Sequence, residues 1–132
     1  MKTYLYKHCI PFQDTDMAGV VHYTKILGYV ELAEHAYLSD LGIDAISNKG
    51  GLPKVYVECD YLFPLRFNDM VEVRLLLNKC STKSLHWEFE ITLKGKDFLE
   101  GKLCAKGKMI TVYVNAQGEA INIPTEWFVL LA

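Results

Sequence analysis

The sequence lacks the features that mark membrane and secreted proteins. None of its apolar runs approaches the ~18 residues needed to span a membrane, so no membrane span is expected. The N-terminus has neither the apolar core nor the small-residue cleavage site of a secretory signal peptide. These two absences favour a cytoplasmic location.

Cysteine and histidine are few and scattered. Cys9, Cys59, Cys80 and Cys104 are far apart, and no two form a C-x-x-C pair. Such spacing favours reduced thiols, which behave mostly as small buried apolar groups. The four His also lack the i, i+4 pair of a zinc-binding helix, so neither a metal nor another cofactor is expected.

An excess of positive charge is missing as well. The net charge is −2, which leaves no general basic field to attract nucleic acid, and any site for an anion must be local. Apolar residues make up 51% and charged residues 23% of the 132 positions, as in ordinary globular proteins. This length predicts one domain, residues 1–132, with its own hydrophobic core.

The hydrophobic pattern predicts one long helix and several strands. From His22 to Leu41 apolar residues recur at steps of three and four on most of the circumference, which indicates a largely buried helix. Pro124 is expected to open a short terminal helix. Strands with short connections are expected at residues 3–10, 54–63, 71–79, 86–94 and 98–114. Short connections imply an antiparallel sheet, so the predicted fold class is α+β.

Two carboxylates stand before the long helix, in Asp14-Thr15-Asp16-Met17-Ala18-Gly19-Val20-Val21-His22-Tyr23. They are typical of a helix cap, because Asp and Thr accept hydrogen bonds from unpaired N–H groups. A calcium loop is excluded, because Lys25 stands where a bidentate Glu is required. Catalysis is the remaining interpretation, with a carboxylate beside N–H groups that hold a developing oxyanion.

This run resembles the D-T-D-x-x-G-x-V-x-Y signature of the 4-hydroxybenzoyl-CoA thioesterase family, which are hotdog-fold acyl-CoA thioesterases. The resemblance implies a long central helix wrapped by a five-stranded antiparallel sheet. It places the catalytic carboxylate, as nucleophile or general base, on Asp16, and the oxyanion-binding backbone N–H on Tyr23. Gly19, His22 and Glu31 fall on positions implied in substrate binding.

Two weaker matches extend the resemblance. Lys83-Ser84 is similar to the segment that meets the CoA nucleotide, and the run Tyr61-Leu62-Phe63-Pro64-Leu65-Arg66-Phe67-Asn68-Asp69 is similar to the family's second element. The implied partners are an acyl-CoA and further copies of the chain, as a dimer or a tetramer. The acyl group, aromatic or short to medium aliphatic, is left open, because His22, Lys25 and Ile26 differ from many relatives.

Two other functions compete with hydrolysis. A hotdog-fold dehydratase or hydratase would carry His-Phe-Pro where this chain has Leu62-Phe63-Pro64. A non-catalytic acyl-CoA-binding module has no use for a carboxylate at Asp16, and a hydrolysis assay separates it from an enzyme.

Some charged residues have structural or surface interpretations. Glu34 falls inside the apolar stripe of the helix, where a carboxylate needs a partner, such as a backbone group or a Tyr. Lys102, Lys106 and Lys108 are expected on one strand face, either solvated or in contact with phosphate.

Thioester hydrolysis should not depend on a metal, because the sequence offers no cluster of metal ligands. We expect turnover to survive dialysis against a chelator, measured as release of free CoA thiol. Activity that disappears on dialysis and returns with zinc or magnesium would contradict this.

Overall fold

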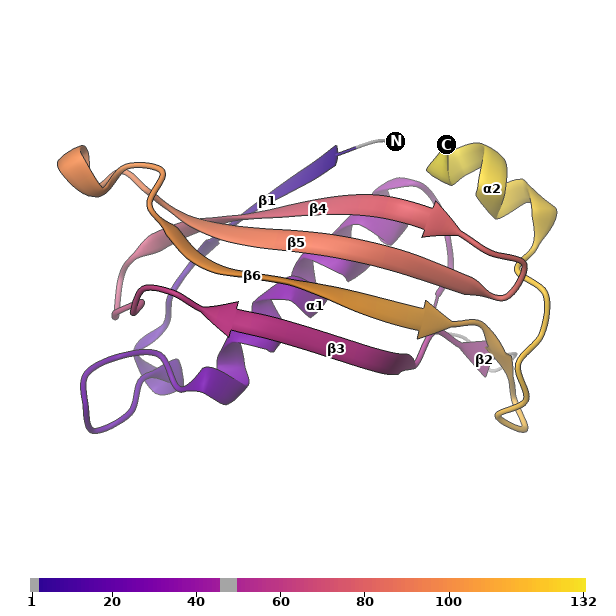
Figure 1. Ribbon diagram of the computed structural model, residues 1–132, viewed down its shortest axis with the longest axis horizontal. Coiled ribbons are helices and arrows are strands. Elements are labelled where there is room, and N and C mark those ends of the chain that lie inside the picture. Colours follow the sequence, from indigo (N-terminus) through magenta and orange to yellow (C-terminus); the bar gives the residue numbers. More distant parts are fainter. Residues whose placement is uncertain (1–2, 46–49) are drawn as a thin grey trace.

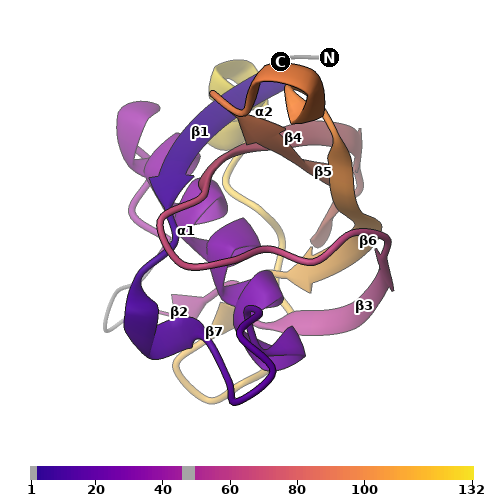
Figure 2. The same cartoon turned by 90° about the vertical axis from the view of Figure 1, so that its left-hand side faces the viewer.

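A sheet curled around one helix dominates the computed structural model, which describes residues 3–45 and 50–132 (Figures 1 and 2). The five-stranded sheet is antiparallel, in the order β1-β4-β5-β6-β3. Its strands are β1 (Thr3–Cys9), β3 (Lys54–Tyr61), β4 (Met70–Cys80), β5 (Ser84–Lys94) and β6 (Leu103–Val112). The helix α1 (Tyr23–Asp40) lies inside the curve of the sheet. The predicted α+β class is confirmed.

Smaller elements connect and close this arrangement. The 3-10 helices η1 and η2 cover Phe12–Asp14 and Asp97–Leu99. A second, two-stranded sheet pairs β2 (Gly50–Gly51) with β7 (Val114–Asn115). The terminal helix α2 (Thr125–Leu131) follows Pro124, as predicted. In the described parts of the chain, neither α1 nor α2 combines the length and the apolar character needed to cross a membrane.

The helix α1 has defined ends and a buried face. At its C-terminus Gly42 adopts a φ of 76°, and the N–H of Ile43 donates to the carbonyl of Leu38 at 2.9 Å, which ends the helix as the sequence indicates. The ring of Tyr37 meets Trp87 of β5 edge-on, with centroids 6.1 Å apart. The buried residues are Ile26, Tyr29, Val30, Ala33, Glu34, Tyr37 and Leu38.

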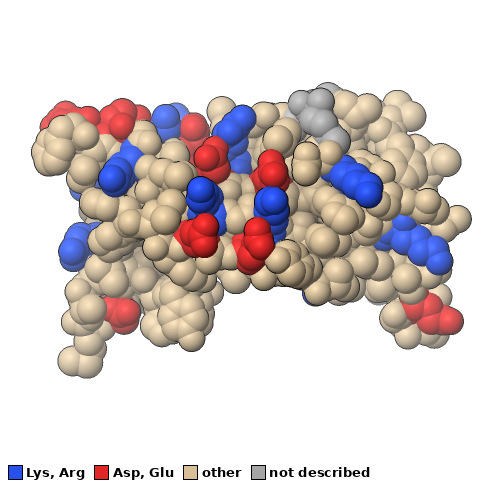
Figure 3. Space-filling view, in the orientation of Figure 1, with Lys and Arg blue, Asp and Glu red and all other residues tan. Residues whose placement is uncertain are grey.

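The sheet separates apolar from charged side chains by strand alternation. On β4 and β5, every second side chain points at α1 and is fully buried, and the others point outward. The buried set is Val71, Val73, Leu75, Leu77, Leu85, Trp87, Phe89, Ile91 and Leu93. Figure 3 shows the outward face, where acidic and basic side chains alternate near the middle of the sheet.

Two predicted strands are shorter than expected. The strand predicted at 98–114 begins only at Leu103, because η2 and a turn at Gly101 (φ 77°) occupy the preceding residues. Lys102 therefore lies before β6. The strand predicted at 54–63 ends at Tyr61, and a bulge at Val55 interrupts its alternation.

Of the three cysteines in predicted strands, which were expected to be buried, only Cys104 is fully buried. Cys104 is buried, Cys59 and Cys80 are half-buried, and Cys9 is exposed. Cys9 and Cys59 lie on the two edge strands, β1 and β3, where one side has no neighbouring strand to cover it. All four are free thiols.

A substitution at Gly107 on β6 tests how closely the strands β3, β5 and β6 pack. A Cβ there would overlap the backbone oxygen of Glu58 on β3 and would lie 2.6 Å from the Phe89 ring. We expect Gly107→Ala to lower the free energy of unfolding by about 2 kcal/mol or more. The measurement is urea denaturation of the purified variant.

Gly28→Ala on α1 is the matched control. A Cβ at this position would have no neighbouring atom within 4 Å outside the backbone of the helix itself. The substitution should raise the free energy of unfolding by roughly 0.5–1 kcal/mol, since Ala costs less backbone entropy than Gly in a helix. Equal stability of the two variants would contradict the close packing at Gly107.

Candidate active site

Asp16 lies in a tight turn at the entrance of α1. The N–H of Gly19 donates to the Asp16 carbonyl and the N–H of Asp16 to the Val20 carbonyl, both at 2.9 Å. Gly19 closes this turn with a φ of 79°, which favours glycine. One carboxylate oxygen of Asp16, Oδ1, accepts from the N–H of Ala18 at 2.9 Å. The side chain is exposed, so its second oxygen faces solvent.

The first turn of α1 leaves one N–H group free. His22 is the N-cap, and its Nδ1 accepts from the N–H of Thr24 at 3.3 Å, while its ring stacks on Tyr23. The N–H of His22 itself donates to the Asp14 carbonyl at 2.9 Å. Among the described residues, the N–H of Tyr23 has no acceptor. Such a group at the positive end of a helix is suited to a developing oxyanion.

The second sequence element supports this turn. The N–H of Val21 donates to the Leu65 carbonyl at 2.7 Å, and Nη1 of Arg66 lies 3.4 Å from the Gly19 carbonyl. Asp69, which is buried, accepts from the N–H of Arg66 at 2.8 Å and pairs with Lys96. The run Tyr61–Asp69 therefore acts as a scaffold for the Asp16 turn.

An apolar cavity of about 290 Å³ opens at the same end of α1. Tyr23 and Ile26 of α1 line one side, and Tyr61, Phe63 and Cys104 line the other. The hydroxyl of Tyr61 donates to the Tyr23 carbonyl at 3.4 Å. Burial raises the pKa of the Cys104 thiol to about 11, so this cysteine is protonated at neutral pH.

Two predicted binding residues lie at the far end of the sheet (Figure 1). Lys83 is in the turn from β4 to β5, where its carbonyl accepts from the N–H of Tyr113 at 2.9 Å. Ser84 begins β5, and its Oγ lies 3.1 Å from Nε2 of His86. A single chain does not bring Lys83 and Ser84 to Asp16.

Glu31 is also remote from Asp16 within one chain. It lies eight residues beyond Tyr23, about 12 Å along the helix axis. Lys54 of β3 lies 3.4 Å from Glu31 and 2.7 Å from the buried Glu34. The expected partner of Glu34 is therefore present, but it is a lysine rather than a backbone group or a Tyr.

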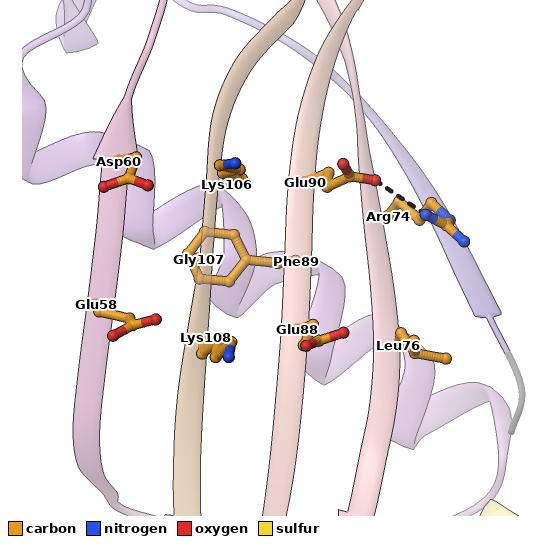
Figure 4. A pocket seen from close by; sticks show the side chains of 10 residues that line it. All are labelled: Glu58, Asp60, Arg74, Leu76, Glu88, Phe89, Glu90, Lys106, Gly107 and Lys108. Carbon is orange, nitrogen blue, oxygen red and sulfur yellow. Dashed lines mark hydrogen bonds and ion pairs between the residues drawn. The ribbon is translucent and has the colours of Figure 1, made fainter.

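The outer face of the sheet carries a separate hollow of about 440 Å³ (Figure 4). The strand register places Lys106 between Asp60 and Glu90, and Lys108 between Glu58 and Glu88. Arg74 pairs with Glu90 at 2.9 Å. Because four carboxylates outnumber these three cations, the hollow is poorly suited to phosphate, and Lys106 and Lys108 fit a solvated face.

Several contacts that fix the site have no signal in the sequence. Tyr29 of α1 donates to Oδ2 of Asp14 at 2.7 Å, and Arg66 reaches the Gly19 carbonyl. No local pattern signals these pairs, because they join separate elements. Within residues 3–45 and 50–132, no group of three or more His, Cys, Asp or Glu side chains is placed to hold a metal ion.

The sheet wrapped around one helix, with a carboxylate at the helix entrance, defines a hotdog-fold protein. The model of the thioesterase-like superfamily matches residues 10–129. The chain belongs to this superfamily, which confirms the resemblance seen in the Asp14–Tyr23 motif.

Individual relatives agree with the family. A 1,4-dihydroxy-2-naphthoyl-CoA hydrolase from Rippkaea orientalis is 32% identical over 85% of this chain and 82% of its own length. One from Synechococcus elongatus is 36% identical over 57% of this chain, and the match spans only 59% of that relative. The solved structure of a gentisyl-coenzyme A thioesterase has a TM-score of 0.85 and 29% identity, over 97% of this chain and 99% of its own.

The raised pKa of Cys104 gives a direct test of its local environment. At about pH 8 its thiolate fraction should be roughly 0.1%, so iodoacetamide should label it far more slowly than Cys9. Mass spectrometry of proteolytic peptides measures both rates, and the exposed Cys9 is the internal control. Equal rates would contradict the buried, protonated thiol.

Proposed function

We propose that this protein hydrolyses the thioester of an acyl-CoA to the free acid and CoA, with Asp16 as the reacting carboxylate. One observation carries the proposal: a solvent-facing carboxylate oxygen of Asp16 and the unpaired N–H of Tyr23 share the entrance of α1, beside an apolar cavity. The family and the names of its members support the same reaction.

The chemistry follows from these groups. The thioester carbonyl oxygen accepts a hydrogen bond from the Tyr23 N–H, which stabilises the negative charge that develops there. Asp16 attacks the carbonyl carbon, or removes a proton from a water molecule that attacks. The carbon–sulfur bond then breaks and CoA leaves as a thiolate. In the first route, water hydrolyses the resulting anhydride.

We propose that the acyl group is aromatic. The cavity beside the first turn of α1 has two tyrosines and a phenylalanine in its wall, which suits a planar ring. The Rippkaea orientalis hydrolase and the gentisyl-coenzyme A thioesterase are both named for hydroxylated aromatic acyl groups. We therefore place aromatic acyl-CoAs ahead of short or medium aliphatic ones.

The active unit that we propose is a homodimer joined through β3. This strand is an edge of the sheet, and within residues 3–45 and 50–132 no strand pairs with its open side. Val57 and Tyr61 point toward the α1 side of the sheet, yet they are 38% and 49% exposed. A second copy would cover these apolar side chains by two-fold symmetry.

Such a dimer would also complete the site. In one chain, the Tyr61 end of β3 lies beside Tyr23, and the Lys54 end lies near the β4–β5 turn. Two-fold antiparallel pairing of β3 brings the Lys54 end of one subunit to the Tyr61 end of the other. Lys83 and Ser84 of the second subunit then approach Asp16 of the first, where they bind the nucleotide of CoA. Glu31, which contacts Lys54, would approach from the second subunit with the Lys54 end of β3, while Gly19 and His22 lie at the same helix entrance as Asp16.

Asp16→Asn should abolish hydrolysis without unfolding the protein. The change keeps the shape of the side chain and removes the charge that attacks or activates water, so kcat should fall by about 100-fold or more. The readout is thiol release from 4-hydroxybenzoyl-CoA, with circular dichroism to monitor the fold. The control is Asp44→Asn, which alters an exposed carboxylate in the loop after α1. Retention of more than about a tenth of kcat would refute the role of Asp16.

A heterodimer separates a shared site from a site within one chain. Lys83→Ala should raise KM several-fold at unchanged kcat, because it removes a contact with phosphate. We expect an Asp16→Asn/Lys83→Ala heterodimer, isolated through two different tags, to show about half the wild-type kcat with the wild-type KM. Its intact Asp16 and intact Lys83 then meet in one site.

The opposite arrangement predicts a different KM. If Lys83 served its own chain, the heterodimer would keep the raised KM of the Lys83→Ala protein. Failure to recover any heterodimer, together with full activity of a monomer in light scattering, would refute the shared site.

A further inference from the structure

We propose that Asp14 and Tyr29 are positioning residues, which hold the carboxylate of Asp16 in register with the N–H of Tyr23. The inference rests on the proposed hydrolysis, and it assigns a role to the first carboxylate of the Asp14–Asp16 pair. Neither residue touches the reacting atoms, and both act through the backbone of the turn.

Asp14 makes two different contacts with the start of α1. Its carbonyl accepts from the N–H of His22 at 2.9 Å, immediately before the oxyanion donor Tyr23. Its side-chain Oδ2 accepts from the hydroxyl of Tyr29 at 2.7 Å, almost two helical turns further on. Asp14 therefore connects the loop to the start of α1 at two points, His22 and Tyr29.

The same residue is covalently close to the reacting carboxylate. Asp14 precedes Asp16 by two residues, and the turn that follows returns to the helix through the Thr15–Val21 bridge. A rotation of the Asp14 backbone would move both Asp16 and the Asp14 carbonyl, which accepts from the His22 N–H. How firmly Asp14 is held therefore contributes, together with the hydrogen bonds within the turn, to the position of the Asp16 carboxylate relative to the Tyr23 N–H.

The packing of Tyr29 allows it to hold the Asp14 side chain in place. The Tyr29 side chain is buried at 3% exposure, and the ring of His8 on β1 packs against it with centroids 4.7 Å apart. Burial and the hydrogen bond to Asp14 raise the pKa of Tyr29, which keeps the hydroxyl protonated as a donor. A hydrogen bond that a carboxylate accepts is charge-assisted, and such bonds are roughly twice as strong as those between neutral groups.

Tyr29→Phe and Tyr37→Phe form a matched pair on the same helix. Tyr37 is equally buried, at 5% exposure, but its hydroxyl has no partner among the described residues. With 4-hydroxybenzoyl-CoA as the probe, we expect Tyr29→Phe to lower kcat by about 10-fold or more. Its KM should change by less than about two-fold, because substrate contacts remain. Tyr37→Phe should keep kcat near the wild-type value.

Two substitutions at Asp14, one conservative and one not, test the same contact from its other side. Asp14→Asn keeps an oxygen that can accept from Tyr29, so it should retain more kcat than Asp14→Ala, which removes the acceptor. Equal kcat losses in Asp14→Asn and Asp14→Ala would argue against the side-chain contact. Equal kcat in Tyr29→Phe and Tyr37→Phe would overturn the inference.

A second readout does not depend on turnover. Amide hydrogen exchange of the peptide covering residues 11–23 should accelerate in Tyr29→Phe and stay at the wild-type rate in Tyr37→Phe. Unchanged exchange in both would overturn the positioning role, even if the wild-type protein hydrolysed no acyl-CoA. A wild-type protein without hydrolysis, but with faster exchange in Tyr29→Phe, would refute the proposed function alone.

Discussion

Backbone hydrogen bonds hold the entrance of α1 from two sides, and the site depends on them. The N–H of Val21 is bound to the carbonyl of Leu65, and the N–H of His22 is bound to the carbonyl of Asp14. Because these two amides are satisfied, Tyr23 provides the first N–H of the helix that is free to meet a ligand. The loop before α1 and the run Tyr61–Asp69 are therefore two halves of one structure, although they are far apart in sequence.

The parts of this structure that follow local rules could be predicted from the sequence. The spacing of apolar residues predicted α1 almost to its ends, and the motif around Asp16 located the turn in front of it. The start of β6 was missed because alternation continues through Gly101, where a turn intervenes. The contacts of Tyr29 with Asp14 and of Lys54 with Glu34 join residues 15 and 20 positions apart across different elements, so no local pattern reveals them.

The uncovered edge at β3 links the fold to the proposed reaction. One chain separates Asp16 from Lys83 and Ser84 by the length of the sheet, and the same chain leaves Val57 and Tyr61 exposed. The proposed two-fold pairing at β3 would resolve both, because it would cover apolar surface and bring opposite ends of two sheets together. On the charged outer face, in contrast, Lys106 and Lys108 lie opposite carboxylates of the neighbouring strands, which leaves little positive charge to attract phosphate.

Binding of the acyl carbonyl at the entrance of α1 is the step on which the proposed reaction depends. Its most direct test is the change in backbone amide NMR signals when the wild-type protein binds a ketone analogue of 4-hydroxybenzoyl-CoA, in which a methylene separates the carbonyl from sulfur. We expect the largest downfield shift at the Tyr23 amide, with smaller shifts along Asp16–Gly19. An unmoved Tyr23 amide, with the largest shifts at Glu88 and Lys108 on the outer face, would contradict it.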